Sequence, residues 1–404
     1  MDDDAVEYKP VSVKDVLAEM KDTAELLIDL SYSAVLLGSV DIAEEVLDLE
    51  SQMEVLHLQA RMSLLMAARN PADAEALAPV LGVVGAAEKI SDASGDIAKV
   101  VLEEVGLPEA MRAALPEAVE SVERATVSPD STYVNRSLGD ITLETETGVR
   151  VIAIRRDGEW LLNPDAETTI ESDDVALLRG PREGLEDVYT TLTGEPYEQP
   201  EPPAPEFADL ERAVDSIVLM KNMSELAVDL AYGAVLFDSK PVAEEVLELE
   251  AEVDALQSRF EAWVLRAASR VDEPVDLRGL VQLGQATEVI SDAAVEISEG
   301  VLRGIGTHPV VAAAVEESDE VIVRYTVNPD SDLAGKTLGE AAVKTETGMR
   351  VIAVRHTRRE SRRTGRAASD WAISPQASTE IEPGDVLVAK GTRTGADRLA
   401  ALVN

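Results

Sequence analysis

Pairs of carboxylates recur four residues apart along the chain, which places both acids of a pair on one face of a helix, one turn apart. Two helices that face each other with such pairs can surround a hard divalent cation with oxygen ligands. The alternative is that an acid-rich composition makes such pairs common. The pairs are Glu25/Asp29, Glu44/Asp48 and Glu88/Asp92, followed by Glu225/Asp229, Glu244/Glu248 and Glu288/Asp292.

Other chemistry is limited by residue types that are missing. The sequence has no cysteine, which excludes disulfides, thiolate metal sites and thiol catalysis, and its three histidines are not paired at helical spacing. It contains no nucleophile–base pairing, no P-loop and no Gly-rich strand-to-helix loop with a downstream ribose-binding acid. We therefore expect a protein that is not an enzyme and that does not bind NAD or ATP on a Rossmann lobe.

The second set of acids reflects a duplication of the whole chain with a period of 200 residues. AEEVLDLE at 43–50 returns as AEEVLELE at 243–250, and ETETGVRVIAI at 144–154 returns as KTETGMRVIAV at 344–354. Chemistry that one copy needs should appear in both, so each copy tests the other.

Composition sets the class of protein. The 404 residues carry a formal net charge of −42, yet 45% of them are hydrophobic, which argues against an acidic disordered tail. We interpret the charge as a surface adapted to a salt-loaded cytoplasm, and it argues against nucleic-acid binding, which needs clustered Lys and Arg. No apolar stretch reaches the roughly 20 residues of a membrane helix, and the N-terminus lacks a signal peptide. We expect a cytoplasmic protein that is not inserted in the membrane.

Long helices must position the acids. Apolar residues recur at the helical period over 14–37, and Gly38-Ser39 ends this segment. We predict further helices over 41–69 and 75–105 and a short one from Glu109, which together form an antiparallel bundle. From Glu123 the pattern changes to β-branched strands, a hairpin at Asp157-Gly158 and a closing helix over 182–192.

The predicted fold class is therefore α+β, with two antiparallel helical bundles alternating with two small α+β modules. At about 70 residues each module buries one sheet face poorly, so we expect the two modules to pair with each other. The second hairpin carries an arginine-rich insert at 356–369, either a solvated loop or a phosphate-contacting or self-docking arm. The predicted boundaries are 1–121 for bundle 1, 122–193 for module 1, 194–208 for a proline-rich linker, 209–320 for bundle 2 and 321–404 for module 2.

Each bundle resembles half of a PhoU protein, the cytoplasmic regulator of phosphate uptake. The resemblance rests on AAEKISDASGDIAK at 86–99, ATEVISDAAVEISE at 286–299 and AEEVLDLESQMEVL at 43–56. It implies divalent metal ions as cofactors, although the family motif ends in Asp where this chain has Glu248. The implied ligands are Glu44, Asp48, Glu88 and Asp92 in the first copy and Glu244, Glu248, Glu288 and Asp292 in the second.

Each α+β module resembles the C-terminal TrkA domain, the ligand-sensing half (RCK-C) of potassium-transport regulators, and the whole chain resembles tandem regulators of the haloarchaeal type. The match covers SLGDITLETETGVRVIAIRRDGEWLLNPDAETTIESDDVALLRG at 137–180, TLGEAAVKTETGMRVIAVRH at 337–356 and ISPQASTEIEPGDVLVAKG at 373–391. Some relatives bind cyclic di-adenosine monophosphate here, which makes it a candidate ligand. The implied ligand-binding residues are Ile152, Ile154, Arg155, Arg156, Asn163 and Pro164, with Ile352, Val354, Arg355, His356 and Pro375 in the second copy, where Ser374 replaces Asn163.

The two resemblances imply a non-catalytic cytoplasmic sensor that controls potassium or other cation transport. Its expected partner is a membrane cation transporter, channel or antiporter, and a homodimer is an open alternative to a single chain. A PhoU-type regulator of phosphate uptake or signalling remains the competing function.

Overall fold

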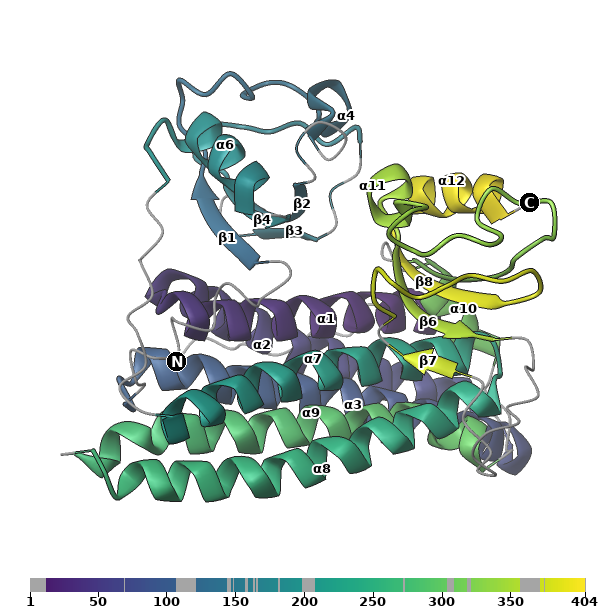
Figure 1. The fold of residues 1–404 in the computed structure, drawn as a ribbon, viewed down its shortest axis with the longest axis horizontal. Coiled ribbons are helices and arrows are strands. Elements are labelled where there is room, and N and C mark those ends of the chain that lie inside the picture. The colour runs from purple at the N-terminus through teal and green to yellow at the C-terminus, as the bar shows by residue number, and fades with distance from the viewer. Residues whose placement is uncertain are drawn as a thin grey trace.

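In the described part of the chain, six long helices form the body of the molecule (Figure 1). The computed structural model describes residues 12–68, 70–106, 121–143, 147, 149–156, 159–162, 164, 166–180, 182–197, 208–271, 273–303, 309–317, 321–356, 371–373 and 375–403. The first copy supplies α1 (Val13–Leu37), α2 (Val40–Ala67) and α3 (Pro71–Leu102). The second supplies α7 (Ala208–Leu236), α8 (Lys240–Ala268), the short 3-10 helix η2 (Pro274–Leu277), α9 (Arg278–Leu302) and α10 (Pro309–Glu317).

Helix ends follow local signals in the sequence. Gly38 adopts a left-handed conformation with φ of 63° and closes α1, as predicted, because glycine takes this conformation without steric cost. Helix α3 begins at Pro71, earlier than predicted, because the Asn70 side chain accepts a hydrogen bond from the backbone N–H of Asp73 at 3.0 Å. The helix predicted from Glu109 lies outside the described residues.

The two bundles share one hydrophobic core. Helix α3 packs along α9, and α10 of the second copy packs on α1 of the first. A single cluster of buried apolar side chains runs through both copies and includes Leu27, Ile90, Leu230 and Ile290. Because burial of apolar surface drives this packing, the copies are joined through their interior rather than only through the linker.

Each α+β module is a four-stranded antiparallel sheet with the order β1-β4-β2-β3 or β5-β8-β6-β7. In the first module a closing helix covers the outer sheet face, and Ile154, Leu178 and Val188 lie in the core between them. The first module contains β1 (Ser121–Thr126), α4 (Leu138–Ile141), β2 (Arg150–Arg156), β3 (Glu159–Leu162), β4 (Val175–Gly180) and α6 (Arg182–Thr193). The second contains β5 (Val321–Thr326), α11 (Val343–Thr347), β6 (Arg350–Arg355), β7 (Trp371–Ile373), β8 (Val386–Gly391) and α12 (Arg393–Val403).

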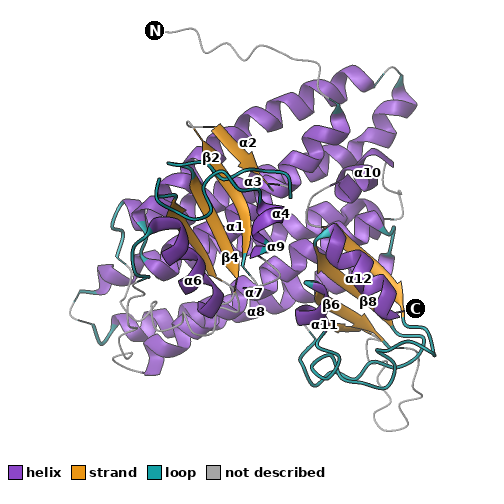
Figure 2. Cartoon of the chain, turned by 90° about the horizontal axis from the view of Figure 1, so that it is seen from above, coloured by secondary structure: helices purple, strands orange, loops and turns teal. Residues whose placement is uncertain are grey.

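The predicted pairing of the two modules is wrong for the described elements. The modules lie apart over the same side of the helical body (Figures 1 and 2), and no described strand or helix of one packs extensively against the other. The inner sheet face is covered by the bundle instead. A β-bulge in the pairing of β2 with β4 turns Ile152 into the shared core, and the same irregularity in β6 turns Ile352 there.

Candidate functional site

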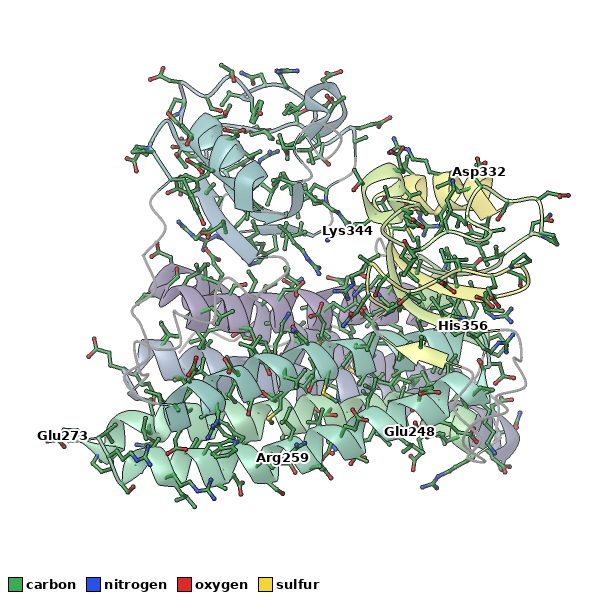
Figure 3. The ribbon with its side chains drawn as sticks, viewed as in Figure 1. Glu248, Arg259, Glu273, Asp332, Lys344 and His356 are labelled. Atoms are coloured by element: carbon green, nitrogen blue, oxygen red, sulfur yellow. The ribbon has the colours of Figure 1, made fainter. Side chains whose placement is uncertain are left out.

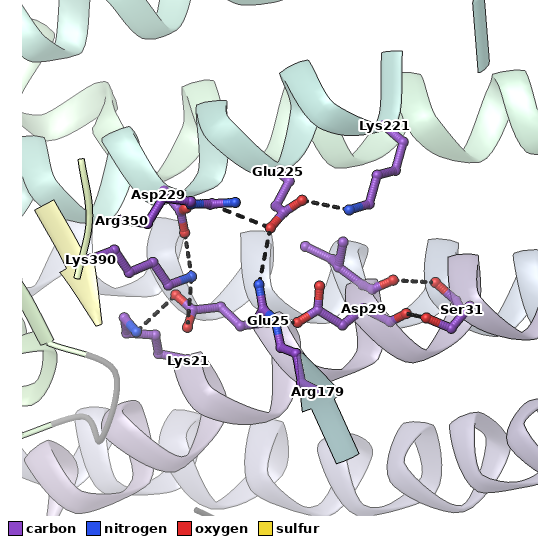
Figure 4. A network of polar contacts seen from close by, with 12 residues as sticks. Lys21, Glu25, Asp29, Ser31, Arg179, Lys221, Glu225, Asp229, Arg350 and Lys390 are labelled. Atoms are coloured by element: carbon purple, nitrogen blue, oxygen red, sulfur yellow. Dashed lines mark hydrogen bonds and ion pairs between the residues drawn. The ribbon is translucent and has the colours of Figure 1, made fainter. Parts of the chain in front are cut away.

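A network of buried charges lies where the modules meet the helices (Figure 4). Glu25 and Asp29 on α1 lie near Glu225 and Asp229 on α7, which are their counterparts in the second copy. Two of the predicted acid pairs therefore meet at the junction of the copies. Like charges at this spacing repel each other, so cations must compensate them.

The modules supply these cations from the strands next to the helices. Arg179 of β4 donates to Asp29 of its own copy at 2.8 Å, and its second terminal nitrogen lies 3.6 Å from Glu225 of the other copy. Lys390 of β8, at the same place in the second module, lies 2.5 Å from Asp229 and 3.4 Å from Glu25. Each module therefore contacts an acid of both copies.

Three further cations complete the network. Arg350 of β6 lies 2.9 Å from Asp229 and 3.5 Å from Glu225. On the helices themselves, Lys21 pairs with Glu25 at 2.8 Å and Lys221 pairs with Glu225 at 2.6 Å. The side chains of Asp229 and Lys390 are only 1% and 6% exposed. At such burial an ion pair gains little overall but is costly to break from one side, so the network fixes how each module sits on the helices.

Burial and neighbouring charges shift the pKa values of these acids in different directions. Burial raises the pKa of Asp29 to about 6, against the opposing effect of Arg179. Burial likewise raises the pKa of Asp229, although Lys390 and Arg350 lower it. Burial alone would raise the pKa of Glu225, but Lys221, Arg350 and Arg179 together hold it well below its ordinary value.

The raised pKa of Asp29 predicts a dependence of stability on pH. Folded Asp29 binds its proton more tightly than the unfolded chain does, so its contribution to stability falls as pH rises from about 4 to about 6. A shift of about two pKa units corresponds to about 3 kcal/mol. We expect Asp29→Asn to remove up to about this much of the stability loss between pH 4 and pH 7.

Chemical unfolding of wild type and variant across this pH range measures the difference. Asp15→Asn, at an exposed acid of the same helix, is the matched control and leaves the slope unchanged. Parallel curves for wild type and Asp29→Asn would contradict the assignment.

Arg155, which the sequence predicts to contact a ligand, is engaged by the helices. Its guanidinium lies 2.8 Å from Glu45 of α2 and 3.5 Å from Asp48, and it lies over the Trp160 ring at 6.0 Å from the centroid. Arg124 of β1 reaches the same Glu45 carboxylate at 3.3 Å. Burial raises the pKa of Glu45, against the effect of both arginines. Glu45 thus holds the guanidinium that the resemblance to the TrkA-C domain assigns to ligand binding.

Arg156 and His356 contact matching buried acids. Arg156 donates two hydrogen bonds to Asp174, at 2.8 and 2.7 Å, and His356 Nδ1 lies 2.9 Å from Asp385. Each acid also accepts a backbone N–H three residues earlier, from Glu171 or Glu382. These contacts tie the end of a strand to the turn before the next one.

The remaining predicted ligand residues are mostly covered. Besides Ile152 and Ile352 in the shared core, Ile154 and Val354 are fully buried in the module cores, and Pro164 and Pro375 are half-buried. Arg355 is half-buried on β6. The pKa of Arg324 is lowered mainly by burial and, to a smaller extent, by the charge of Arg355. Asn163 lies outside the described residues.

The four predicted metal ligands of each copy do not gather into one cluster in the described part of the chain. Glu44 and Asp48 are exposed on α2, whereas Glu88 on α3 lies 2.8 Å from His57. Partial burial is the largest cause of a raised pKa of Asp92, and the charges of Glu88, Asp96 and Glu54 raise it further. The charge of Asp92 also raises the pKa of Glu50, after burial as the larger cause, so the α2 acids near Asp92 are Glu50 and Glu54 and not Glu44 and Asp48.

The second copy repeats this arrangement. Glu244 and Glu248 are exposed on α8 (Glu248 is labelled in Figure 3), and Glu288 accepts a hydrogen bond from Gln257 at 2.9 Å. Asp292 lies at the surface. Partial desolvation is the largest cause of its raised pKa, and the charges of Glu288 and Asp254 raise the pKa further. No group of three or more possible ligands with the geometry to hold a metal ion occurs in the described part of the chain. Metal binding stays a prediction.

Sequence reasoning missed the cations of the network, Arg179, Arg350 and Lys390. A signal was present, because the duplication keeps a cation at each of these places. Arg150 corresponds to Arg350, and Arg179 in VALLRG at 175–180 corresponds to Lys390 in VLVAKG at 386–391. A cation that both copies of a strongly acidic chain retain at the same position indicates an ion pair, although the sequence does not identify the acid that it contacts.

Family models match the chain in four places. The PhoU domain matches residues 17–101 and 217–301, and the TrkA-C domain matches residues 122–193 and 322–404. These matches agree with the observed alternation of helical and α+β units. Within the described residues, no helix is both long enough and apolar enough to cross a membrane.

Two curated proteins are similar to parts of the chain. The probable potassium channel protein 2 of Methanocaldococcus jannaschii is 26% identical over 143 residues, which cover 33% of this chain and 38% of that protein. The K(+)/H(+) antiporter subunit KhtT of Bacillus subtilis is 34% identical over 91 residues, which cover 20% of this chain and 55% of that protein. The chain thus spans only about two fifths to about half of the length of these relatives.

Among solved structures, PhoU from Pseudomonas aeruginosa aligns with a TM-score of 0.42 and 13% identity over 72% of this chain and 96% of that one. The GsuK RCK domain aligns with a TM-score of 0.19 and 14% identity over 71% of this chain and 64% of that one.

Proposed function

The chain is built of two PhoU domains and two TrkA-C domains in alternation, and from this premise we propose that it is a non-catalytic cytoplasmic regulator of potassium or other cation transport. The names of the two curated relatives, a potassium channel protein and a K(+)/H(+) antiporter subunit, support a transporter, channel or antiporter as the partner. In this proposal the TrkA-C modules sense a ligand and the helical body passes the signal on.

The charge network is the observation that carries the proposal. Arg179 and Lys390 each pair with acids of both copies, so a module cannot move without breaking ion pairs with both α1 and α7. A ligand shifts such an equilibrium only if it binds one arrangement better than the other. A module that is bonded to both copies meets this condition, because its displacement alters the helical body.

The contact between Arg155 and Glu45 suggests how a ligand acts. A phosphate group is a stronger bidentate acceptor for a guanidinium than water, and it competes with the buried Glu45 carboxylate for Arg155 and Arg124. Cyclic di-adenosine monophosphate carries two phosphates and remains the ligand that we propose. Its binding releases Arg155 from α2 and loosens the first module from the helices.

Glu45→Gln tests this competition. Removing the charge of Glu45 weakens its hold on Arg155 by about 1.5 kcal/mol, so we expect the ligand to bind about tenfold more tightly. Calorimetric titration of cyclic di-adenosine monophosphate in high salt measures the affinity. Arg155→Gln is expected to abolish the heat.

Glu44→Gln, at the exposed neighbouring acid, is the matched control and leaves the affinity unchanged. Absence of heat with wild type at millimolar ligand removes this ligand but not the transport function. Equal affinity in all variants removes the proposed site.

Phosphate signalling is the second candidate function, and the two PhoU domains favour it. The two candidates differ in which uptake changes when the protein is absent from the cell. Altered phosphate uptake with unaltered potassium uptake would favour this second function.

A further inference from the structure

Helix α2 carries an apolar stripe on its outer face. Val55, Leu58, Met62 and Leu65 follow one another at intervals of three and four residues, which places them on one side of the helix. Met66 widens this α2 stripe at its end. All are exposed except Met62, which is half-buried, and exposure reaches 73% at Leu65.

The second copy provides an internal comparison. The corresponding residues of α8 are Ala255, Ser258, Ala262, Leu265 and Arg266. Two of these are the much smaller alanine, and only Leu265 keeps a large apolar side chain, at a matching exposure of 74%. Because the two copies share fold and ancestry, the fold does not require the stripe, and its presence in the first copy alone indicates a purpose beyond folding.

The stripe also lies in a stretch without acids. Residues 55–70 contain no Asp or Glu, although 78 acids in 404 residues would place about three in a stretch of this length. A net charge of −42 makes two chains repel each other over most of their surface. The α2 stripe is a place where two chains can approach without facing carboxylates.

We propose that the α2 stripe is the interface of a homodimer, in which it packs antiparallel against the same stripe of a second copy. A twofold contact is self-complementary and needs only one patch on each chain, which matches a stripe present once. Pairing α2 with α8 of another copy would set the apolar residues against Ser258 and Arg266. An anionic lipid surface is disfavoured because it repels the acidic chain.

The twofold axis passes between Leu58 and Met62 in this arrangement. Leu58 then lies opposite Met62 of the second copy, and Val55 lies opposite Leu65 of the second copy. The interface is independent of the proposed function, since it uses neither the modules nor the charge network.

Molar mass in solution tests the dimer. In molar KCl at tens of micromolar protein, light scattering should give about twice the chain mass of 43.3 kDa. Leu58→Glu/Leu65→Glu should give the mass of one chain, with an unchanged circular dichroism spectrum because both residues are exposed. Leu265→Glu, at the equally exposed residue of the second copy, should remain dimeric. A monomeric wild type, a dimeric stripe variant or dissociation by Leu265→Glu overturns the proposal.

The absence of cysteine allows a second test of the orientation. Chains with Leu58→Cys are mixed with chains with Met62→Cys and oxidised, and the products are identified by mass spectrometry. An antiparallel interface gives mainly the mixed 58–62 disulfide, because only this pair lies within disulfide reach. Mainly 58–58 and 62–62 products, or no disulfide, contradict the antiparallel contact.

Discussion

Replacement of Lys390 by methionine should lower the free energy of unfolding by about 3 kcal/mol, a loss typical of breaking a buried ion pair from one side. Asp229 is buried and loses its partner at 2.5 Å, and Glu25 loses its contact with the second module. Arg350 still lies 2.9 Å from Asp229, which keeps the loss at the lower end of the usual range. Denaturant unfolding in high salt measures the change.

Two further variants separate charge from packing. Lys240→Met removes a cation of an exposed pair, 3.8 Å from Glu244, and should change stability by less than about 1 kcal/mol. Lys390→Met/Asp229→Leu removes both buried charges and should recover most of the loss, because Arg350 keeps Glu225 as a partner and Glu25 keeps Lys21. Equal effects of Lys390→Met and Lys240→Met would show that the network does not hold the module.

Transfer from molar KCl to dilute buffer should lower the melting temperature by more than about 10 °C, which corresponds to about 8 kcal/mol for a chain of this size that unfolds as one unit. The cause is the net charge of −42, whose repulsion is screened within about 3 Å at 1 M salt and extends much further in dilute buffer. Salt screens buried pairs such as Lys390 with Asp229 only weakly in either condition. The change in melting temperature therefore measures the repulsion between surface charges.

A neutral osmolyte distinguishes screening from water activity. Sucrose at the osmolality of molar KCl does not screen charge and should restore only a small part of the lost melting temperature. Full recovery in sucrose, or a melting temperature that is unchanged by salt, would mean that the acidic surface is not tuned to salt.

The helices and strands could be predicted because their signals are local. The period of apolar residues over α1, the glycine at position 38 and the change of pattern near Glu123 each act within a few residues. Because the sequence repeats after 200 residues, each element predicted in the first copy was also predicted in the second. The packing of the sheets could not be predicted in this way. An apolar sheet face in the sequence predicts that the face is buried, but it does not identify the element that covers it.

For the buried charge network, the sequence predicted the acids but not the cations that compensate them. Spacing in the sequence singled out Glu25/Asp29 and Glu225/Asp229 and required compensation, but the partner of Asp29 lies 150 residues further along the chain, at Arg179. No local pattern joins residues so far apart. The resemblance also led to Arg155 as a ligand residue, whereas tertiary packing places it on Glu45.

Register explains the outcome for the acids of α2. Glu44 and Asp48 share a motif with the family, but both side chains are exposed, and the α2 acids near Asp92 are Glu50 and Glu54 instead. On a helix, a step of two or of six residues turns the side chain by more than half of a circle, which changes the face on which it lies. Sequence spacing fixes which acids share a face but not which turn of the next helix that face meets.

We propose that the chain regulates potassium transport through modules that the buried network holds on the helices. The most direct measurement is uptake of labelled rubidium and labelled phosphate by cells from which the gene is deleted, then restored with wild type or with Lys390→Met/Asp229→Leu. We expect deletion to change rubidium uptake several-fold and phosphate uptake little, wild type to restore it, and the double variant, folded but without this link, to restore it only in part. Rubidium uptake that is unchanged by the deletion, or full restoration by the double variant, would contradict the account.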